Sequence, residues 1–574
     1  MTTITYEPDA GLIAIRAGYA QKDACKAITG AKARYNDATG RFDAWVYPAT
    51  ATTAADIREA VQAGRFGPAT IDPAVEQLAG DAQVAVDTDE VDFRSLTAPY
   101  DHQKRGYGLI DGRQSTMLAW EMGAGKTKPV VDWVANARPL RTLILCPKAV
   151  VAVWPAEFAK HAALPVKVVA LEAKSVKARA ELAGRICRMT EGPLVLVLNY
   201  EAAWREPFRS WALAHPWDAI VCDESHRIKS PGGKASRFVG ELGKRARRRY
   251  RRADHMPKLL ALTGTPMPHS PMDLYAQFRF LDPGIFGTSA ARFKAQWAIM
   301  GGYQKHEIVA WRDVPEMHRR MAMIADRVRK ADVLDLPEMV HEKIPIDLGA
   351  KSREAYHACV HDMALAVRAG IIVPANALVR LLRLQQITGG YLPVDDGQDM
   401  ELGDEKQAAI VDLLTDLDPT EPLAVFCKFH HDLDAIHAAA AKAGRQSVEL
   451  SGRRNDIGAR WQDGPDTVAA VQIRAGGLGI DLTRARYGCF YSVGFSLGDY
   501  EQALARLHRQ GQYRSVTYIH LVAANTVDEK VYSSLQAKAD VVDAVLQEMR
   551  AMPLAPQKNN RFSQTAVGCD NGAR

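Results

Sequence analysis

Residues 118 to 128 read LAWEMGAGKTK, a short apolar run that ends in a glycine-bracketed turn and a lysine. Glycine reaches the backbone angles with which consecutive N–H groups surround a phosphate. Lys126 would then neutralise charge on the β- and γ-phosphates, and the Thr127 hydroxyl would bind Mg²⁺. The full GxxxxGK[ST] pattern requires glycine where Trp120 stands, so a glycine-rich turn that caps an ordinary helix stays open as an alternative. The predicted nucleotide-binding residues of this loop are Gly123, Ala124, Gly125, Lys126 and Thr127.

The composition indicates a soluble globular protein of several domains. The chain has 574 residues, 47% of them hydrophobic and 24% charged, which exceeds what one core accommodates. No apolar run is long enough to cross a bilayer, and the first twenty residues lack the pattern of an export signal. The eight cysteines form no CxxC pair, which favours reduced thiols over zinc ligands. We therefore expect a cytoplasmic protein of a bacterial or phage-infected host cell, without a membrane partner.

The charge of the chain is unevenly distributed. The net charge is +6, but residues 1–100 hold nine Lys and Arg against fourteen Asp and Glu, a balance of −5. Residues 101–574 therefore carry +11. Such an excess fits a polyanionic partner, and it fits equally well a solvated surface of an arginine-rich protein.

A second candidate site follows the apolar run in WDAIVCDESH, which ends with Asp223 and Glu224. Adjacent carboxylates point in different directions, so Asp223 can hold Mg²⁺ while Glu224 polarises an attacking water. His226 would sense the γ-phosphate. An acidic pair at this position is also a common helix N-cap, although the glycine loop about a hundred residues upstream favours the catalytic interpretation.

Three polar residues elsewhere in this half of the chain are candidates for nucleotide recognition and coupling. Gln103 lies about twenty residues before the glycine loop, where its amide would bond an adenine edge. Thr263 and Thr265 end the apolar run KLLALTGTP and would couple the nucleotide site to a nucleic-acid track. A surface glutamine and an ordinary turn are the alternatives.

The second half of the chain carries its own candidates. Residues 475–483, AGGLGIDLT, place small residues where the backbone must approach phosphate closely, so we include Gly479 and Asp481 among the nucleotide-binding residues. The stretch DYEQALARLHRQGQ is predicted to set Gln502, Arg506 and Arg509 on one helix, where residues three and four apart share a face. The two guanidinium groups would then stabilise charge on the γ-phosphate across a cleft. An arginine-bearing surface helix is the alternative.

Apolar runs alternate with helix-like segments in both halves, which predicts parallel, doubly wound sheets. The expected fold is α/β, with two RecA-like lobes of doubly wound parallel sheet, helical insertions and a small N-terminal α+β domain. The expected parts are an accessory domain over 1–66, an acidic linker over 67–95, a first lobe over 96–289, a helical protrusion and brace over 290–400, a second lobe over 401–552 and a disordered tail over 553–574.

The order of motifs GAGKT, DESH, LTGTP, GGLGIDL and ARLHRQGQ resembles that of the Swi/Snf family of superfamily-two DNA translocases. The resemblance spans residues 96–546 and supports the nucleotide roles given above, those of the two arginines included. The segment 31–47 resembles the small HepA-related (HARP) module of annealing helicases. The chain departs from the family at Trp120, where aspartate is usual, and in the basic run KRARRRYRR at 244–252. That run would either grip phosphates or form a solvated loop.

The resemblance implies a monomeric DNA-dependent ATPase that uses ATP and Mg²⁺ and moves on double-stranded or forked DNA in remodelling, repair or replication. An RNA helicase shares the two-lobe engine, but its second motif is typically DEAD. A nuclease would need a further metal-binding carboxylate centre, and the sequence offers none that convinces. A non-enzymatic nucleic-acid-binding scaffold is the remaining alternative, and it conflicts with the presence of every expected catalytic residue type.

Overall fold

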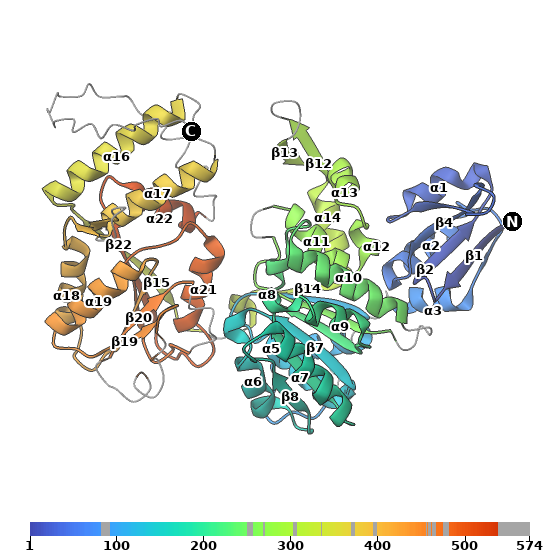
Figure 1. Cartoon of the computed structure of the whole chain (residues 1–574), viewed down its shortest axis with the longest axis horizontal. Coiled ribbons are helices and arrows are strands. Elements are labelled where there is room, and N and C mark those ends of the chain that lie inside the picture. Colours follow the sequence, from blue (N-terminus) through green and yellow to red (C-terminus); the bar gives the residue numbers. More distant parts are fainter. Residues whose placement is uncertain are drawn as a thin grey trace, which may run out of the picture.

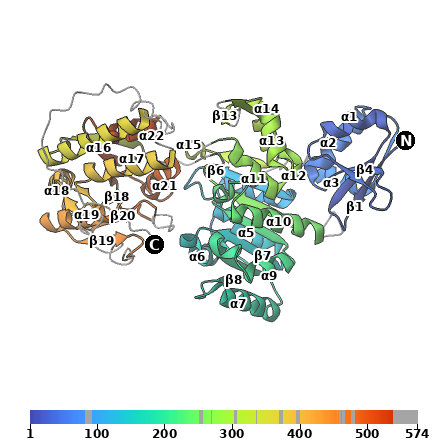
Figure 2. The same cartoon turned by 45° about the horizontal axis from the view of Figure 1, so that its top comes forward.

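The computed structural model consists of an N-terminal domain and two larger lobes joined in a row (Figure 1). Lobe 1 lies in the middle, with lobe 2 on one side and the N-terminal domain on the other, and Figure 2 shows the same order from a second direction. The described residues are 1–81, 92–249, 256–267, 270–301, 307–333, 336–368, 374–393, 399–454, 456, 461, 467–474 and 481–537.

The N-terminal domain is a five-stranded sheet covered by helices, with strand order β3-β4-β2-β1-β5. Its strands are β1 (Thr2–Glu7), β2 (Leu12–Arg16), β3 (Lys32–Tyr35), β4 (Phe42–Pro48) and β5 (Ala69–Ile71), and its helices are α1 (Lys22–Ala27), α2 (Ala51–Gln62) and α3 (Pro73–Asp81). The Thr50 side chain caps α2 by accepting a hydrogen bond from the Thr53 N–H. The predicted α+β character of this region is thus observed.

The predicted linker begins later than expected. We expected an acidic linker over 67–95, but β5 pairs in parallel with β1, and Val75 and Leu78 of α3 are fully buried in the domain core. This stretch was predicted to be a linker because it is acidic and has few aromatic residues, yet Val75, Leu78 and Ala79 are enough to anchor α3 in the existing core. Residues 82–91 lie outside the described part of the chain.

Lobe 1 is built on a seven-stranded sheet, order β14-β6-β11-β10-β7-β9-β8, in which every neighbouring pair is parallel. The strands are β6 (Ser115–Trp120), β7 (Arg141–Cys146), β8 (Lys167–Ala170), β9 (Leu194–Asn199), β10 (Ala219–Asp223), β11 (Lys258–Leu262) and β14 (Ala325–Val328). The helices are α4 (Asp101–Gly112), α5 (Thr127–Ala137), α6 (Val153–His161), α7 (Val176–Met189), α8 (Tyr200–Ala203), α9 (Phe208–Ala214), α10 (Lys234–Arg249) and α11 (Met272–Leu281).

The apolar runs of lobe 1 become strands that are buried on both faces. Along β7, Leu143 and Leu145 join one core cluster, whereas Ile144 and Cys146 join the cluster on the opposite face. All four side chains are fully buried. Successive side chains of a strand point to opposite faces, and helices cover both faces of a doubly wound sheet, so such a strand requires an unbroken apolar sequence.

The insertion after lobe 1 contains a β-hairpin as well as the helices that we predicted for residues 290–400. Its elements are α12 (Pro283–Phe286), α13 (Ala290–Trp297), β12 (Ala298–Gly301), β13 (Glu307–Trp311), α14 (Val314–Ala322) and α15 (Lys330–Val333). The chain re-enters the lobe-1 sheet through β14 before it crosses to lobe 2. The crossing between lobes therefore lies between Val328 and Met339, inside the region expected to be one helical insertion.

Lobe 2 has a six-stranded sheet of order β15-β22-β21-β18-β20-β19, again parallel throughout. Its strands are β15 (Met339–Ile346), β18 (Leu423–Cys427), β19 (Ser447–Leu450), β20 (Val468–Gln472), β21 (Tyr487–Phe490) and β22 (Val516–Ala523), and a small hairpin comprises β16 (Tyr391–Leu392) and β17 (Met400–Glu401). The helices are α16 (Ala350–Arg368), α17 (Pro374–Thr388), α18 (Glu405–Asp416), α19 (His430–Lys442), α21 (Leu497–Leu507) and α22 (Val527–Gln536). The two predicted RecA-like lobes are confirmed. The tail expected over 553–574 lies outside the described residues.

Three arginines, one on α10 of lobe 1 and two on the insertion helices α13 and α14, hold the N-terminal domain through hydrogen bonds to its backbone and a threonine. Arg248 Nε donates to the Ala10 carbonyl at 2.8 Å, and Arg292 Nη1 donates to the Ala31 carbonyl at 2.6 Å. Arg320 donates to the Thr29 hydroxyl at 2.7 Å. The N-terminal domain is therefore an extension of lobe 1.

The described part of the basic run 244–252 belongs to helix α10. Arg247 is only 7% exposed and donates to the Phe280 carbonyl at 2.8 Å, and burial lowers its pKa to about 10. Arg248 reaches the N-terminal domain. Neither residue is in a solvated loop, so that alternative is wrong for this part of the run.

Candidate nucleotide site between the two lobes

The glycine loop connects the end of β6 to the start of α5, with both bracketing glycines in the left-handed region. Gly123 has φ +87° and Gly125 has φ +76°. A Cβ on Gly125 would collide with the Gln103 amide. Only glycine fits both the backbone conformation and the space, and the loop leaves its N–H groups near the N-terminus of a helix, where anions are favoured.

Lys126 lies at the base of this loop with its ammonium group fixed by backbone. Its Nζ donates to the carbonyls of Trp120 at 3.0 Å and Glu121 at 3.3 Å, and the residue is 9% exposed. Burial lowers the pKa of Lys126, and the carboxylates of Glu224 and Asp223 oppose that shift. A phosphate would supply this ammonium with the negative charge that the protein alone provides incompletely.

Two residues of α4 support the loop from behind. Nε2 of His102 donates to the Ala124 carbonyl at 2.9 Å. The Gln103 amide accepts from the Tyr100 N–H at 3.0 Å and donates to the Gly125 carbonyl at 3.4 Å. Gln103 thus caps its own helix and braces the loop. His102 was not among the residues predicted from the sequence, although it directly precedes Gln103.

Trp120, the departure from the family pattern, is fully buried and has a polar role. Its indole Nε1 donates to Asp326 Oδ2 at 2.7 Å, and Arg105 pairs with the same carboxylate at 3.2 Å. Asp326 belongs to β14, so Trp120 ties the strand before the loop to the last strand of the lobe-1 sheet. The missing glycine does not prevent the loop from forming.

Asp223 and Glu224, at the carboxyl end of β10, have different hydrogen-bond partners. Trp154 Nε1 donates to Asp223 at 3.2 Å, and the Glu224 N–H donates to the same carboxylate at 2.9 Å. Glu224 has φ +48°, which is uncommon for a residue with a side chain. Burial and the charge of Glu224 raise the pKa of Asp223. For Glu224, burial is outweighed by the hydrogen bond with His226 and the charge of Lys126, so its pKa is lowered.

His226 connects this acidic pair to the strand end of β11. Its Nδ1 lies 3.3 Å from Glu224 Oε2 and 3.4 Å from the Thr263 hydroxyl. Thr263 is fully buried, and its hydroxyl accepts from the Thr265 N–H at 3.2 Å. The predicted coupling residues of lobe 1 thus form one contiguous chain that starts at Glu224.

Lobe 2 contributes the arginines, with one difference from the prediction. Gln502 and Arg506 lie on α21, but the helix ends at Leu507, so Arg509 lies in the following turn and the expectation of a single helix was wrong. Burial and the charge of Arg509 lower the pKa of Arg506 to about 10. Nε of each arginine is buried and has no hydrogen-bond partner among the described residues. Both guanidinium groups therefore retain donor capacity for a ligand.

These residues line one cavity of about 360 Å³ between the lobes. Its lining includes eight polar or ionisable residues that were not predicted as site residues: Thr97, Tyr100, Lys128, Glu157, Lys160, His161, Arg227 and Gln510. The predicted residues in its lining are Gln103, Gly123, Gly125, Lys126, Thr127, Asp223, Glu224, Gln502, Arg506 and Arg509. The eight side chains that were not predicted come from distant parts of the sequence and are brought together by the fold.

Two predicted nucleotide-binding residues of the described part of the chain, Ala124 and Asp481, do not line this cavity, and the side chain of Ala124 is buried. Asp481 is exposed and accepts hydrogen bonds from the backbone N–H and the hydroxyl of Thr483, at 2.9 Å and 2.6 Å, which closes a turn. Gly479 lies outside the described residues.

The donor set of the cavity is suited to Mg²⁺ bound together with phosphates. Thr127 and Asp223 both line the cavity, and Glu224 Oε2 is a buried oxygen without a well-aligned hydrogen bond. Among the described residues, no group of three or more His, Cys, Asp or Glu is arranged to hold a metal ion by itself. Mg²⁺ at phosphate sites characteristically takes one or two protein ligands, so this sparse set fits.

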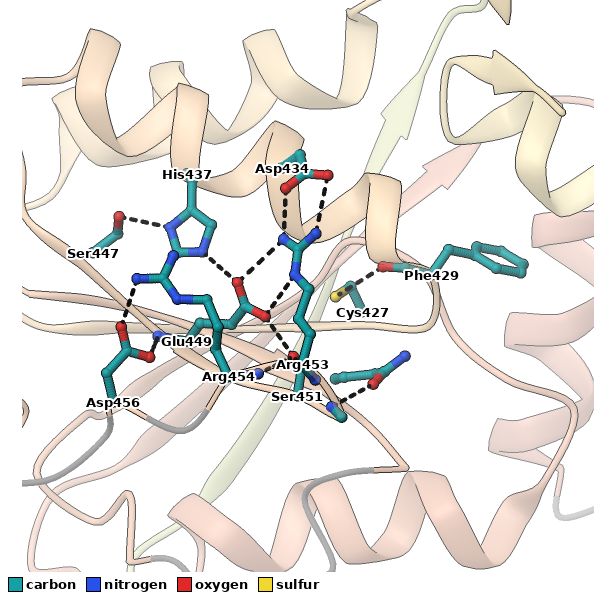
Figure 3. Close-up of polar contacts among 12 residues, drawn as sticks. Cys427, Phe429, Asp434, His437, Ser447, Glu449, Ser451, Arg453, Arg454 and Asp456 are labelled. Carbon is teal, nitrogen blue, oxygen red and sulfur yellow. Dashed lines mark hydrogen bonds and ion pairs between the residues drawn. The ribbon is translucent and has the colours of Figure 1, made fainter. Parts of the chain in front are cut away.

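A separate polar network fixes the turn after β19 in lobe 2 (Figure 3). The buried Glu449 carboxylate accepts from Arg453 Nε at 2.9 Å and lies 3.0 Å from His437 Nε2, and Ser451 also bonds to it. Burial is outweighed by these hydrogen bonds, which lower the pKa of Glu449 to about 2. Arg453 also pairs with Asp434. None of these residues lines the interlobe cavity, and each has a structural partner.

Comparison with known families identifies both lobes. Residues 102–389 match the model of the SNF2-related domain, and residues 405–511 match that of the helicase conserved C-terminal domain. In the described part of the chain, no helix is long and apolar enough to cross a membrane.

Several known proteins are similar to this chain. Protein p41 of Acyrthosiphon pisum secondary endosymbiont phage 1 is 26% identical over 79% of this chain and 98% of its own length. An uncharacterized ATP-dependent helicase of Mycoplasma pneumoniae is 24% identical over 80% of this chain and 43% of its own length. The mouse DNA annealing helicase and endonuclease ZRANB3 is 27% identical over 76% of this chain and 39% of its own length. The chain thus spans nearly all of the phage protein but less than half of the two named helicases.

A solved structure is also similar: the Sulfolobus solfataricus SWI2/SNF2 ATPase core in complex with dsDNA. It is 22% identical, covers 80% of this chain and 95% of its own, and superposes with a TM-score of 0.37.

Proposed function

This chain belongs to the SNF2-related family of ATP-dependent helicases, and we propose that it hydrolyses ATP between its lobes in order to move along double-stranded DNA. The observation that carries the proposal is the cavity lined by Lys126 and Glu224 from lobe 1 and by Arg506 and Arg509 from lobe 2. The residues of the two lobes surround a nucleotide together only when the lobes approach each other, so hydrolysis would be linked to lobe movement.

ATP would enter with its phosphates on the glycine loop. The backbone N–H groups around Gly123 and Gly125 and the ammonium of Lys126 are the donors that this loop offers. Mg²⁺ bound through Thr127 and Asp223 would neutralise charge on the phosphate oxygens. Tyr100 and Gln103 line the same cavity, and Gln103 has one amide N–H left, beyond its bonds to Tyr100 and Gly125, that would be offered to the base.

Glu224 is proposed to position the attacking water. Its pKa is lowered, so the carboxylate is ionised near neutral pH and accepts a hydrogen bond from water. Glu224 pairs with His226, whereas Asp223 accepts from Trp154 and from the Glu224 N–H, so the two carboxylates have different partners and one is available for each role.

Arg506 and Arg509 are proposed to stabilise the charge that develops on the γ-phosphate. A planar guanidinium offers several donors to phosphate oxygens, and arginines in this role contribute about 10³ to 10⁵ in rate in other nucleotidases. Because they come from lobe 2, hydrolysis would require closure, and product release would allow reopening.

DNA is the proposed track. Residues 101–574 carry an excess of eleven positive charges, which suits a polyanion. The chain from Glu224 through His226 to Thr263 and Thr265 leads away from the nucleotide, so it would transmit the state of the γ-phosphate. Each open–close cycle would then advance one lobe along the duplex.

The N-terminal domain is proposed to act as a HARP-like module. It is held to lobe 1 by Arg248 and to the insertion of that lobe by Arg292 and Arg320, so a DNA structure bound there would move together with lobe 1. This arrangement would suit forked DNA.

Displacement of a triplex-forming strand from duplex DNA tests the proposal directly. A duplex translocase removes the third strand only while it hydrolyses ATP. We expect displacement by the wild type and none by Lys126→Ala. ATP hydrolysis that is stimulated by duplex DNA, without displacement of the third strand from any duplex, would contradict translocation.

A further inference from the structure

The connector between the lobes, residues 329–338, contacts the nucleotide site through Lys330. This residue follows β14, the last strand of the lobe-1 sheet, and begins α15. Its position is set by Glu121, which precedes the glycine loop. The Glu121 N–H donates to the Val328 carbonyl at 2.9 Å, and the Lys330 N–H donates to Glu121 Oε2 at 3.0 Å.

Glu121 also touches the phosphate-binding lysine. Its carbonyl accepts from Lys126 Nζ at 3.3 Å, so the backbone N–H, the carbonyl and the carboxylate of one residue have three separate partners. The connector is therefore fixed to the loop that would hold the phosphates.

The side chain of Lys330 crosses to lobe 2. Its Nζ donates to the His508 carbonyl at 3.0 Å. His508 lies between Arg506 and Arg509, and its own Nε2 donates to the carbonyl of Pro337, near the far end of the connector, at 2.8 Å. Both ends of the connector thus hold His508, the residue directly before Arg509.

We propose that Lys330 is a positioning residue, which holds the turn containing Arg509 against the glycine loop so that both arginines reach the γ-phosphate. The proposal rests on the proposed ATPase function and adds a residue outside the cavity lining. The Lys330 Cδ lies 3.7 Å from the position of a Cβ on Gly123, so the side chain passes directly beside the loop on its way to His508.

The ammonium group of Lys330 suits this role because it is a charged donor facing a carbonyl, that of His508. Burial lowers the pKa of Lys330 to about 8, with Glu121 opposing the shift and Lys126 and Arg509 adding to it. The side chain is therefore mainly protonated at neutral pH and remains a donor. Hydrogen bonds of charged donors are stronger than those of neutral ones.

The test compares Lys330→Met with the wild type in DNA-stimulated ATP hydrolysis. We expect kcat to fall roughly 10- to 100-fold, as for loss of a charged hydrogen bond, with KM for ATP changed less than about threefold. Lys330→Arg should recover much of the rate because it keeps a charged donor. The matched control is Lys442→Met. The Lys442 side chain is 57% exposed and pairs with Asp404 at the surface, and such pairs contribute little, so this variant should behave as the wild type.

A double-mutant cycle separates positioning from general stabilisation. If Lys330 acts through Arg509, adding Lys330→Met to Arg509→Ala should lower kcat less than about twofold further. An undiminished effect in that background, or an unchanged kcat in the single variant, would overturn the role of Lys330 while leaving the proposed function in place. A wild type without DNA-stimulated hydrolysis would overturn both.

Discussion

The Cβ of Arg509 in lobe 2 lies 3.3 Å from the position that a Cβ on Gly123 of lobe 1 would occupy. The glycine loop and the arginine turn are therefore in contact across the interlobe cleft, in a region where a side chain would separate them. This contact underlies the proposed link between lobe closure and hydrolysis.

Gly123→Ala should impair hydrolysis for two reasons. The φ of +87° costs an L-residue about 1 to 2 kcal/mol, and the added methyl group meets Arg509. We expect kcat to fall about tenfold or more, which corresponds to about 1.4 kcal/mol or more. Gly64→Ala is a matched control, because Gly64 has φ +71° but no atom within 4 Å of the added Cβ. Equal rates for both variants would show that the contact with Arg509 is unimportant.

Glu224→Gln should retain ATP binding but lose hydrolysis. The amide cannot serve as the base that orients water, a contribution of about 10² to 10⁴ in rate. Binding of a fluorescent ATP analogue and steady-state hydrolysis measure the two effects separately. Glu206→Gln, at a side chain that is 54% exposed, serves as the control. A Glu224→Gln variant that hydrolyses ATP at the wild-type rate would exclude this residue as the base.

Arg509→Ala should slow hydrolysis and spare ATP affinity, since lobe 1 supplies the phosphate loop. Arg509→Lys should recover little, because an ammonium lacks the planar set of donors. Single-turnover kinetics would measure the chemical step, and equilibrium titration would measure affinity. A defect confined to affinity would assign Arg509 to ground-state binding instead.

The stability of lobe 2 should depend on pH through His520. Its Nε2 lies 3.0 Å from the Tyr500 hydroxyl, and burial, with a contribution from His341, lowers its pKa to about 4. The folded protein therefore holds this histidine neutral, and stability is fully present above the unfolded pKa of about 6.5 and is lost as pH falls below it.

Between pH 7 and 5 this one group should reduce the free energy of unfolding by about 2 kcal/mol. His520→Gln does not titrate, so chemical denaturation of the variant should show a correspondingly smaller loss. The same loss in both proteins would mean that other groups control the acid sensitivity.

Much of the architecture followed from the sequence because lobe strands are buried on both faces. Residues 194–199, for example, form an unbroken apolar run and become β9 as predicted. Strands β14 and β15 were not predicted. Their sequences, ADRV and MVHEKIPI, carry polar residues because β14 and β15 each end a sheet, where one side of the backbone has no neighbouring strand.

Parts of the site could be predicted where the chemistry requires particular residue types at neighbouring positions of the sequence. The glycine loop and the pair Asp223 and Glu224 are such cases, and both line the cavity. Lys330 and His102 were missed because each acts through a backbone carbonyl that is distant in the sequence or carries no side-chain signal. Arg509 was placed on a helix because periodicity alone does not reveal that α21 ends at Leu507.

The most direct test of the central claim is steady-state ATP hydrolysis with no nucleic acid, single-stranded DNA, duplex DNA, forked DNA and RNA, each at two salt concentrations. We predict strong stimulation by duplex or forked DNA, weaker at the higher salt because phosphate contacts release counterions, and no turnover in Lys126→Ala. Stimulation by RNA alone, or equal rates with and without every nucleic acid, would contradict a DNA translocase.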